Sequence, residues 1–336
     1  MLARLLNGDR RALARLLTGI ENEDADALAA LTALYPHTGQ AHIIGVTGAP
    51  GTGKSTLVSA LTRAFRERGR TVGVLAVDPS SPFTGGAILG DRVRMRDLAG
   101  DFGIFIRSMA SRGNLGGLAR TTRDMARALD AAGFDIILIE TVGAGQGEIE
   151  IARLAQTVVV VEAPGLGDDV QAIKAGILEI ADVLVVNKAD RPGAENTARA
   201  LRAMLELGHA AARERIRADF AVSDGVDSAA ISDWVPPIVQ TAASEGGGID
   251  ALIEALDAHR AYLHADGHWA QIERRQIELE LLHRLRDELL QRLLDQVSTG
   301  QLDAVIDQVQ SRAIDPYTAV SRMLNQANLM MDHPDR

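Results

Sequence analysis

Residues 48–55 read Gly48-Ala49-Pro50-Gly51-Thr52-Gly53-Lys54-Ser55, and Thr56 follows them. This run fits the pattern GxxxxGKS, in which glycines allow a loop so tight that successive backbone N–H groups point at phosphate oxygens. An apolar run precedes the loop, and a helical pattern from Lys54 toward Arg68 follows it. The start of that helix would add a partial positive charge, Lys54 would bridge the terminal phosphates, and Ser55 would complete a Mg²⁺ shell. The sequence therefore predicts a phosphate-binding loop between a strand and a helix.

Short β-branched runs alternate with helical segments on both sides of this loop. The runs cover residues 43–47, 71–77, 103–106, 135–141, 157–161, 183–186 and 237–241. Because they are almost continuously apolar, they are typical of a parallel sheet that is covered on both faces. The alternation predicts an α/β fold with a doubly wound, mainly parallel sheet.

The strand signals are confined to the middle of the chain. The pattern over residues 1–40 predicts a helical extension, which ends at the helix-breaking residues 35–39. The phosphate-loop domain is predicted over residues 41–260. Residues 261–336 predict a C-terminal helical arm, with leucines at three- and four-residue spacing between Gln276 and Leu294. Two interpretations fit this helix: it packs on its own domain, or it pairs with a second subunit in a homodimer.

The apolar run 183–186 leads into Asn187-Lys188-Ala189-Asp190, which matches the guanine-reading pattern NKxD. The Asp190 carboxylate can accept both the N1–H and the exocyclic amine of guanine. Adenine offers neither donor in that arrangement and would leave the carboxylate unpaired, at a cost of roughly 1–3 kcal/mol. Lys188 would cover the base with its aliphatic stem, and Asn187 would tie this loop to the phosphate loop. The sequence therefore predicts GTP or GDP as the ligand.

A second base loop is predicted at Thr241-Ala242-Ala243-Ser244, after the run 237–241. GTPases usually have Ser-Ala or Thr-Ser-Ala there, so Ala242 departs from the pattern. A backbone N–H bond to the base oxygen would survive this departure, whereas a hydroxyl contact would not.

Three acids are candidates for positions around Mg²⁺. Glu140 and Asp78 each end an apolar run, where a parallel sheet places its ligands, and both are predicted to act with Lys54 in catalysis. Asp91 follows a glycine-rich stretch, and its assignment depends on the resemblance described below. All three could instead be solvated loop acids, which is the usual environment of Asp and Glu.

The chain has three lysines, Lys54, Lys174 and Lys188, among its 35 lysines and arginines. A lysine in so arginine-rich a chain indicates a position that needs a compact ammonium rather than a guanidinium fork. Two of the three lie in the nucleotide motifs, which makes Lys174 a functional candidate together with Asp168 and Gln171. The alternative is an ordinary loop in which Asp168 caps the next helix.

Composition excludes several classes of protein. A net charge of −10 argues against a general nucleic-acid surface, and the absence of cysteine excludes disulfides and thiolate metal sites. No stretch approaches the roughly 18 apolar residues that span a bilayer. The N-terminus has no apolar signal core, and acids follow its arginines closely. We therefore expect a cytoplasmic protein that binds neither membrane nor nucleic acid.

The chain resembles the methylmalonyl-CoA mutase-associated GTPases, the MeaB family, over nearly its whole length. The strings that carry the resemblance are Gly48 to Ser55, Ala76 to Ser81, Gly86 to Arg94, Gly113 to Arg120, Glu140 to Gly143 and Asn187 to Asp190. The resemblance implies a homodimeric Mg²⁺-GTPase, joined by its C-terminal helices, that chaperones an adenosylcobalamin-dependent acyl-CoA mutase. It also implies that Asp91 belongs to the acids around the metal, and that 165–174 is a switch responding to the mutase.

The expected chemistry is in-line attack of water on the γ-phosphate. Gln146, shortly after Glu140, is the candidate for positioning that water, and hydrolysis is expected to be slow until a partner completes the site.

Three other functions fit parts of the sequence. The first is a nickel-insertion GTPase, but such proteins usually carry His tracts or Cys ligands, whereas this chain has eight scattered histidines and no cysteine. The second is an ATP-dependent kinase or transport ATPase, which conflicts with the NKxD pattern. The third is a nucleotide-locked scaffold that binds the mutase without turnover.

Overall fold

The computed structural model describes residues 2–78, 98, 100–110, 115–141, 154–165, 180–219, 234–297 and 299–326. The chain divides into two compact units, residues 1–269 and residues 270–336, which are treated separately below. Asp91, Gln146, Asp168, Gln171 and Lys174 lie outside the described residues.

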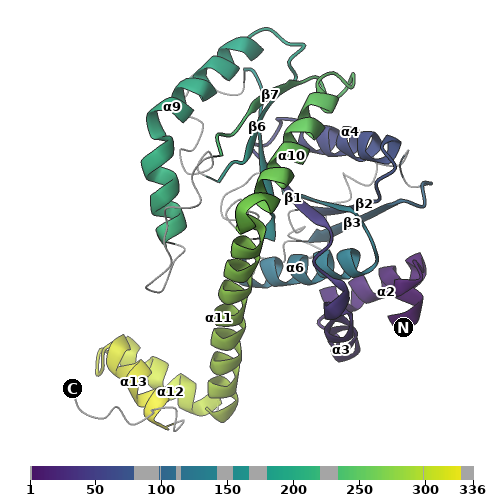
Figure 1. The fold of residues 1–336 in the computed structure, drawn as a ribbon. Coiled ribbons are helices and arrows are strands. Elements are labelled where there is room, and N and C mark those ends of the chain that lie inside the picture. Colours follow the sequence, from purple (N-terminus) through teal and green to yellow (C-terminus); the bar gives the residue numbers. More distant parts are fainter. Residues whose placement is uncertain are drawn as a thin grey trace. The chain divides into compact units, whose positions relative to one another are not determined.

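A seven-stranded parallel sheet forms the centre of the first unit, in the order β3-β2-β4-β1-β5-β6-β7 (Figure 1). Its strands are β1 (His42–Thr47), β2 (Val72–Asp78), β3 (Ile104–Ala110), β4 (Ile136–Glu140), β5 (Thr157–Glu162), β6 (Val183–Asn187) and β7 (Ile238–Thr241). Each predicted apolar run corresponds to one strand, and the predicted α/β fold with a parallel sheet is confirmed.

One strand is longer than its apolar run. The prediction stopped at residue 106, but β3 continues through Arg107 and Ser108 to Ala110. The polar Arg107 is tolerated in the strand because its guanidinium pairs with Glu21, with 2.5 Å between Nη2 and Oε2. The partner comes from the N-terminal helices, so apolar patterning alone could not show that the strand continues.

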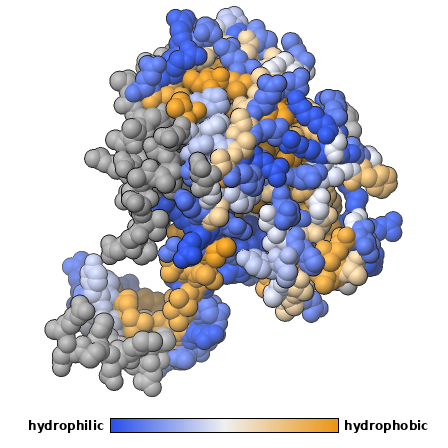
Figure 2. Space-filling model, in the orientation of Figure 1, coloured by the Kyte–Doolittle hydropathy of each residue, from blue (hydrophilic) through white to orange (hydrophobic). Residues whose placement is uncertain are grey.

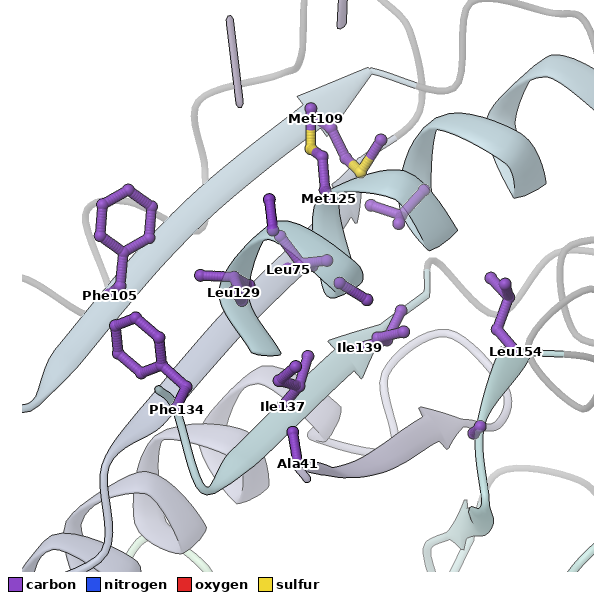
Figure 3. Packing of buried hydrophobic residues seen from close by; sticks show 14 of the residues in the cluster. Ala41, Leu75, Phe105, Met109, Met125, Leu129, Phe134, Ile137, Ile139 and Leu154 are labelled. Carbon is purple, nitrogen blue, oxygen red and sulfur yellow. The ribbon is translucent and has the colours of Figure 1, made fainter. Parts of the chain in front are cut away.

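Helices cover both faces of the sheet, as its apolar strands require. On one face α4 (Lys54–Glu67) and α10 (Ile249–His264) pack over β1, β5 and β6, and their buried residues form one core. The other face is covered by α6 (Leu115–Ala131), α9 (Ala194–Asp219), and the N-terminal α1 (Leu2–Leu6), α2 (Arg10–Glu21) and α3 (Ala25–Leu34). Figure 3 shows part of this second core, where Phe105 meets Phe134 edge-on and Met125 lies near Met109.

The N-terminal helices are joined to the sheet domain by polar contacts as well as by the core. After η1 (Tyr35–His37), the backbone N–H groups of Gly39, Gln40 and Ala41 all donate to the Asp130 carboxylate on α6. Three donors satisfy a largely buried acid, so the link to β1 is held at a fixed position.

The second unit contains most of α11 (His268–Gln296), together with α12 (Thr299–Gln310) and α13 (Pro316–Gln326). Hydrophobic side chains reach its surface, which Figure 2 shows as orange patches on these helices. They include Leu281, Leu282, Leu285, Leu289, Leu290, Leu294, Ile306, Tyr317 and Val320. Among the helices of the described residues, none is both long enough and apolar enough to cross a bilayer.

Candidate nucleotide site

The order of the strands brings the predicted nucleotide motifs to one edge of the sheet. Because all strands are parallel, their carboxyl ends meet at that edge. β1 lies between β4 and β5, where the chain changes the side on which it adds strands, and such a switch point is where doubly wound sheets bind ligands. The phosphate loop follows β1, Glu140 ends β4, and residues 188–190 follow β6.

The phosphate loop is closed by backbone conformations that need glycine. Gly48, Gly51 and Gly53 all have positive φ. A Cβ on Gly48 would lie 2.1 Å from the carbonyl oxygen of Val161, and a Cβ on Gly53 would lie 2.6 Å from Asn187 Nδ2. The loop therefore packs directly on β5 and on the start of the base loop, and larger residues are excluded at both positions.

Lys54 lies within the phosphate loop at the first position of α4. It is buried, and its Nζ donates to the carbonyl oxygens of Gly48 at 2.8 Å and Ala49 at 3.1 Å. Thr52 closes the turn by donating from Oγ1 to the Ala49 oxygen at 2.9 Å. The ammonium is therefore held beside the loop amides, where a terminal phosphate of a nucleotide would need a positive charge.

Ser55 and Glu140 come from different elements and meet at this edge. Ser55 Oγ donates to Glu140 Oε1 at 2.6 Å, and Glu140 is only 4% exposed. The register that pairs Val46 of β1 with Glu140 of β4 places the carboxylate beside the phosphate loop. A hydroxyl and a carboxylate are both hard oxygen ligands, so this pair fits a Mg²⁺ ion that keeps several waters.

Two threonines connect β1 to the loop that follows Glu140. Thr141 donates from its backbone N–H to the Val46 oxygen and from Oγ1 to Thr47 Oγ1, both at 3.2 Å.

Of the other predicted acids, Asp78 is the last residue of β2, at the same edge of the sheet, and its side chain is outside the described part.

Asn187 joins three loops through one buried side chain. Its Nδ2 donates to the Thr52 oxygen at 2.9 Å, and its Oδ1 accepts from Thr241 Oγ1 at 3.1 Å and from the Ala243 N–H at 3.2 Å. Thr241 opens the predicted second base loop, but nothing in the sequence indicates its hydroxyl contact with Asn187. Its position opposite Asn187 in the β6–β7 register is the signal that could have identified it, but that register is not readable from the sequence.

Lys188 and the loop after β7 complete this edge of the sheet. Lys188 has φ +58°, and its Nζ reaches across the phosphate loop to donate to the Gly51 oxygen at 2.6 Å. The Ala189 N–H donates to the Thr241 oxygen, and a backbone bridge between Ala242 and Gly247 closes the loop that contains Ala243 and exposed Ser244. Asp190 is exposed beside them.

Comparisons with known proteins agree with this arrangement. The model of the family described as methylmalonyl Co-A mutase-associated GTPase MeaB matches residues 13–298. A protein of Pyrococcus abyssi described as a GTPase is 44% identical, over 97% of this chain and 95% of that protein. GTPase ArgK of Escherichia coli is 37% identical, over 86% of this chain and 84% of that protein.

A more distant relative is the mitochondrial methylmalonic aciduria type A homolog of Mus musculus. It is 32% identical, over 84% of this chain and 64% of that protein. Among solved structures, one described as a LAO/AO transport system kinase has a TM-score of 0.68 and 29% identity, over 96% of this chain and 95% of that one. Since the family model spans most of the chain, this protein belongs to the MeaB family of methylmalonyl-CoA mutase-associated GTPases.

Proposed function

We propose that the protein binds GTP together with Mg²⁺ and hydrolyses the γ-phosphate. The observation that supports this most is the junction at Asn187, which links the phosphate loop to both predicted base loops. A nucleotide that bridges these loops would contact phosphate ligands at one end and Asp190 at the other. The residues proposed to contact it are Gly48 to Thr56, Asn187, Lys188, Asp190 and Ala242 to Ser244.

Hydrolysis would depend on charge stabilisation by groups that are already positioned. Lys54 and the amides of the phosphate loop would stabilise the charge that spreads over the phosphoryl oxygens in the transition state. Ser55 and Glu140 would hold Mg²⁺, with Asp78 and Asp91 as the further acids around it. When bound, the ion would act as a Lewis acid and offset negative charge on the phosphates. We infer slow turnover in the isolated protein.

The client of this GTPase is proposed to be an adenosylcobalamin-dependent acyl-CoA mutase. Membership of a mutase-associated family supports this, and the coupled action would be loading, protection or reactivation of the mutase cofactor. Asp168, Gln171 and Lys174 are proposed to respond to the mutase, since GTP and GDP can drive a partner only by ordering such segments differently. The cytoplasmic location remains a prediction.

We further propose a homodimer joined through the C-terminal helices. On α11 the exposed leucines include Leu282, Leu285 and Leu289, which recur at three- and four-residue spacing along one face of the helix. A contiguous apolar stripe is costly to leave in water and is typical of helices that pair with a second copy.

The proposed function is tested by nucleotide turnover with and without the partner. We expect slow hydrolysis of GTP, stimulation by one adenosylcobalamin-dependent mutase, and little use of ATP. Lys174→Ala is expected to lose the stimulation, and Lys174→Arg to lose most of it if a compact ammonium is needed. Arg199→Ala, which removes an exposed cation from α9, is the matched control and should keep it.

Each alternative result has a distinct meaning. Absence of GTP turnover under every condition would leave a nucleotide-bound scaffold for the mutase. Equal use of ATP would contradict guanine recognition. GTP turnover that no mutase changes would retain the GTPase and contradict the proposed client.

A further inference from the structure

Aromatic and histidine side chains gather at the amino end of the sheet, opposite the nucleotide motifs. His42 begins β1, Thr157 begins β5, and Asp182 directly precedes β6, while the rest of the group lies on or beside α10 and the first turn of α11. Both tryptophans of the chain belong to it. We call this group the amino-end cluster: His42, Thr157, Asp182, Trp234, His259, Tyr262, His264, His268 and Trp269.

A buried line of polar contacts runs through the cluster. His42 Nε2 lies 2.7 Å from Thr157 Oγ1, which lies 2.8 Å from His259 Nδ1. The other nitrogen of His259 is 3.5 Å from Asp182 Oδ1, and Asp182 Oδ2 accepts the Val158 N–H. His42, Thr157 and His259 are each at most 2% exposed, so water cannot substitute for a lost partner.

The Thr157 hydroxyl limits how many protons this line can hold. It has one hydrogen to donate, and two imidazole nitrogens face its oxygen. If one of these nitrogens carries a hydrogen, the other must be the acceptor for the threonine. If both histidines were protonated, the buried hydroxyl hydrogen of Thr157 would have no acceptor in the line. One cation would also lie on each side of the hydroxyl. The one carboxylate of the line, Asp182, faces His259, so a positive charge on His42 would have only the Thr157 hydroxyl as its partner in the line and is not accommodated there.

The rings of the cluster hold the joint between α10 and α11. Tyr262 on α10 stacks on His268, with ring centroids 4.8 Å apart, and lies 5.3 Å from Trp234. Trp269, in the first turn of α11, stacks on His264 at 4.5 Å and lies 6.4 Å from His42. The short η5 (Ala265–Gly267) that connects the two helices is thereby fixed against the first residue of β1.

We propose that His42, Thr157 and His259 form an acid-sensitive lock, which fixes the α10–α11 joint to the sheet while His42 is neutral and releases it when His42 gains a proton. The step is a reversible proton transfer from solvent to the imidazole and forms no covalent bond besides N–H. None of its members belongs to the nucleotide site, so the lock does not rest on the proposed GTP hydrolysis.

The charges around the lock favour release in acid. Arg260 and His264 on α10, Arg70 before β2, and His259 all act on His42, while Asp182 faces His259 and Asp257 pairs with Arg70. Burial, and after it the positive charges that these groups carry when protonated, with Arg260 the strongest, lower the pKa of His42 well below its usual range. The released state, in which the imidazole reaches water, binds the proton more tightly. Release is therefore favoured as the pH falls below about 6.5, the ordinary value for histidine.

Trp269 reports on the joint directly. In full-length Trp234→Phe protein, Trp269 is the single tryptophan, and its emission can be followed from pH 7.5 to pH 5. We expect a red shift as the ring leaves the cluster, at constant far-ultraviolet circular dichroism. Because release takes up one proton, the ratio of released to locked protein should rise about tenfold per pH unit below the transition's onset.

Variants at two histidines separate the lock from a general acid effect. His42→Gln keeps an amide that can donate to or accept from Thr157 but does not titrate, so the shift should disappear. His37→Gln, which changes an exposed histidine in η1, should keep it. A shift of equal midpoint and amplitude in His42→Gln would overturn the proposal.

Histidine ring NMR on the unmodified protein gives a readout that no variant can confound. The His42 ring should remain neutral down to the pH at which Trp269 moves, and then change together with it. Protonation of His42 at higher pH without any change at Trp269, or absence of any transition before global unfolding, would also overturn the lock.

Discussion

Gly48 illustrates how single residues determine the phosphate loop. Its φ of +137° lies in the region that disfavours side chains, and its Cα faces a backbone carbonyl of β5. The carbonyl belongs to a central strand and cannot move without breaking the sheet. In the sequence Gly48 is one of several glycines that allow a tight loop; in the structure it is also the point where the loop packs directly on β5.

Gly48→Ala should weaken both folding and nucleotide binding. Its methyl group would lie 2.1 Å from the Val161 oxygen, so the loop must move, at a cost of about 2 kcal/mol or more. Gly69→Ala is the control: its φ is +78°, and nothing lies within 4 Å of the new Cβ, so only about 1 kcal/mol of backbone strain is expected. Denaturant unfolding and titration with a GTP analogue measure both effects. Equal losses in the two variants would contradict the packing argument.

Residues in short, contiguous motifs could be predicted from the sequence, and residues joined by tertiary contacts could not. Lys54 and Asn187 are identified by spacing alone, because each motif encodes one loop after one strand. Thr241 and Thr141 make their hydroxyl contacts with residues of other strands, so only the sheet register reveals these contacts. The amino-end cluster draws on segments more than 200 residues apart and left no local pattern.

At the scale of elements, burial on both faces made the strands predictable. Short, β-branched and almost continuously apolar runs, such as the one that forms the fully buried β5, are typical of parallel strands covered on both faces. β3 was predicted too short because Arg107 depends on a helix far away in sequence. For α11, periodicity predicted a helix but could not decide what covers its leucines.

Leu289→Glu is expected to disrupt the proposed dimer. Leu289 is 44% exposed in the single chain, and a carboxylate buried there in an apolar interface should weaken association about tenfold or more. Gln291→Glu adds the same charge two residues further along the helix, on a different side, and should leave association unchanged. Light scattering across a concentration series distinguishes the two. A wild-type monomer at all concentrations, or equal effects of both variants, would contradict dimerisation through this face.

Across the whole molecule, the sheet separates two kinds of polar chemistry. Its carboxyl end gathers the nucleotide motifs around Lys54, Glu140 and Asn187, and its amino end gathers the histidine lock. The fold class followed from the order of apolar runs and the phosphate loop, since a doubly wound sheet places every following loop at one edge. The division of the chain into two units and its proposed pairing with a second copy depend on which exposed faces contact each other. A single sequence does not show which faces do.

The nucleotide preference of Asp190→Asn tests guanine recognition most directly. Xanthine has a carbonyl oxygen where guanine has its exocyclic amine, and an asparagine amide can donate to that oxygen while still accepting the N1–H. The wild-type protein should hydrolyse GTP but neither xanthosine triphosphate nor ATP, and the variant should lose about 100-fold on GTP while gaining xanthosine triphosphate. A variant that keeps its preference for GTP, or a wild type that uses ATP equally well, would contradict the assignment of Asp190 and of the GTPase site built around it.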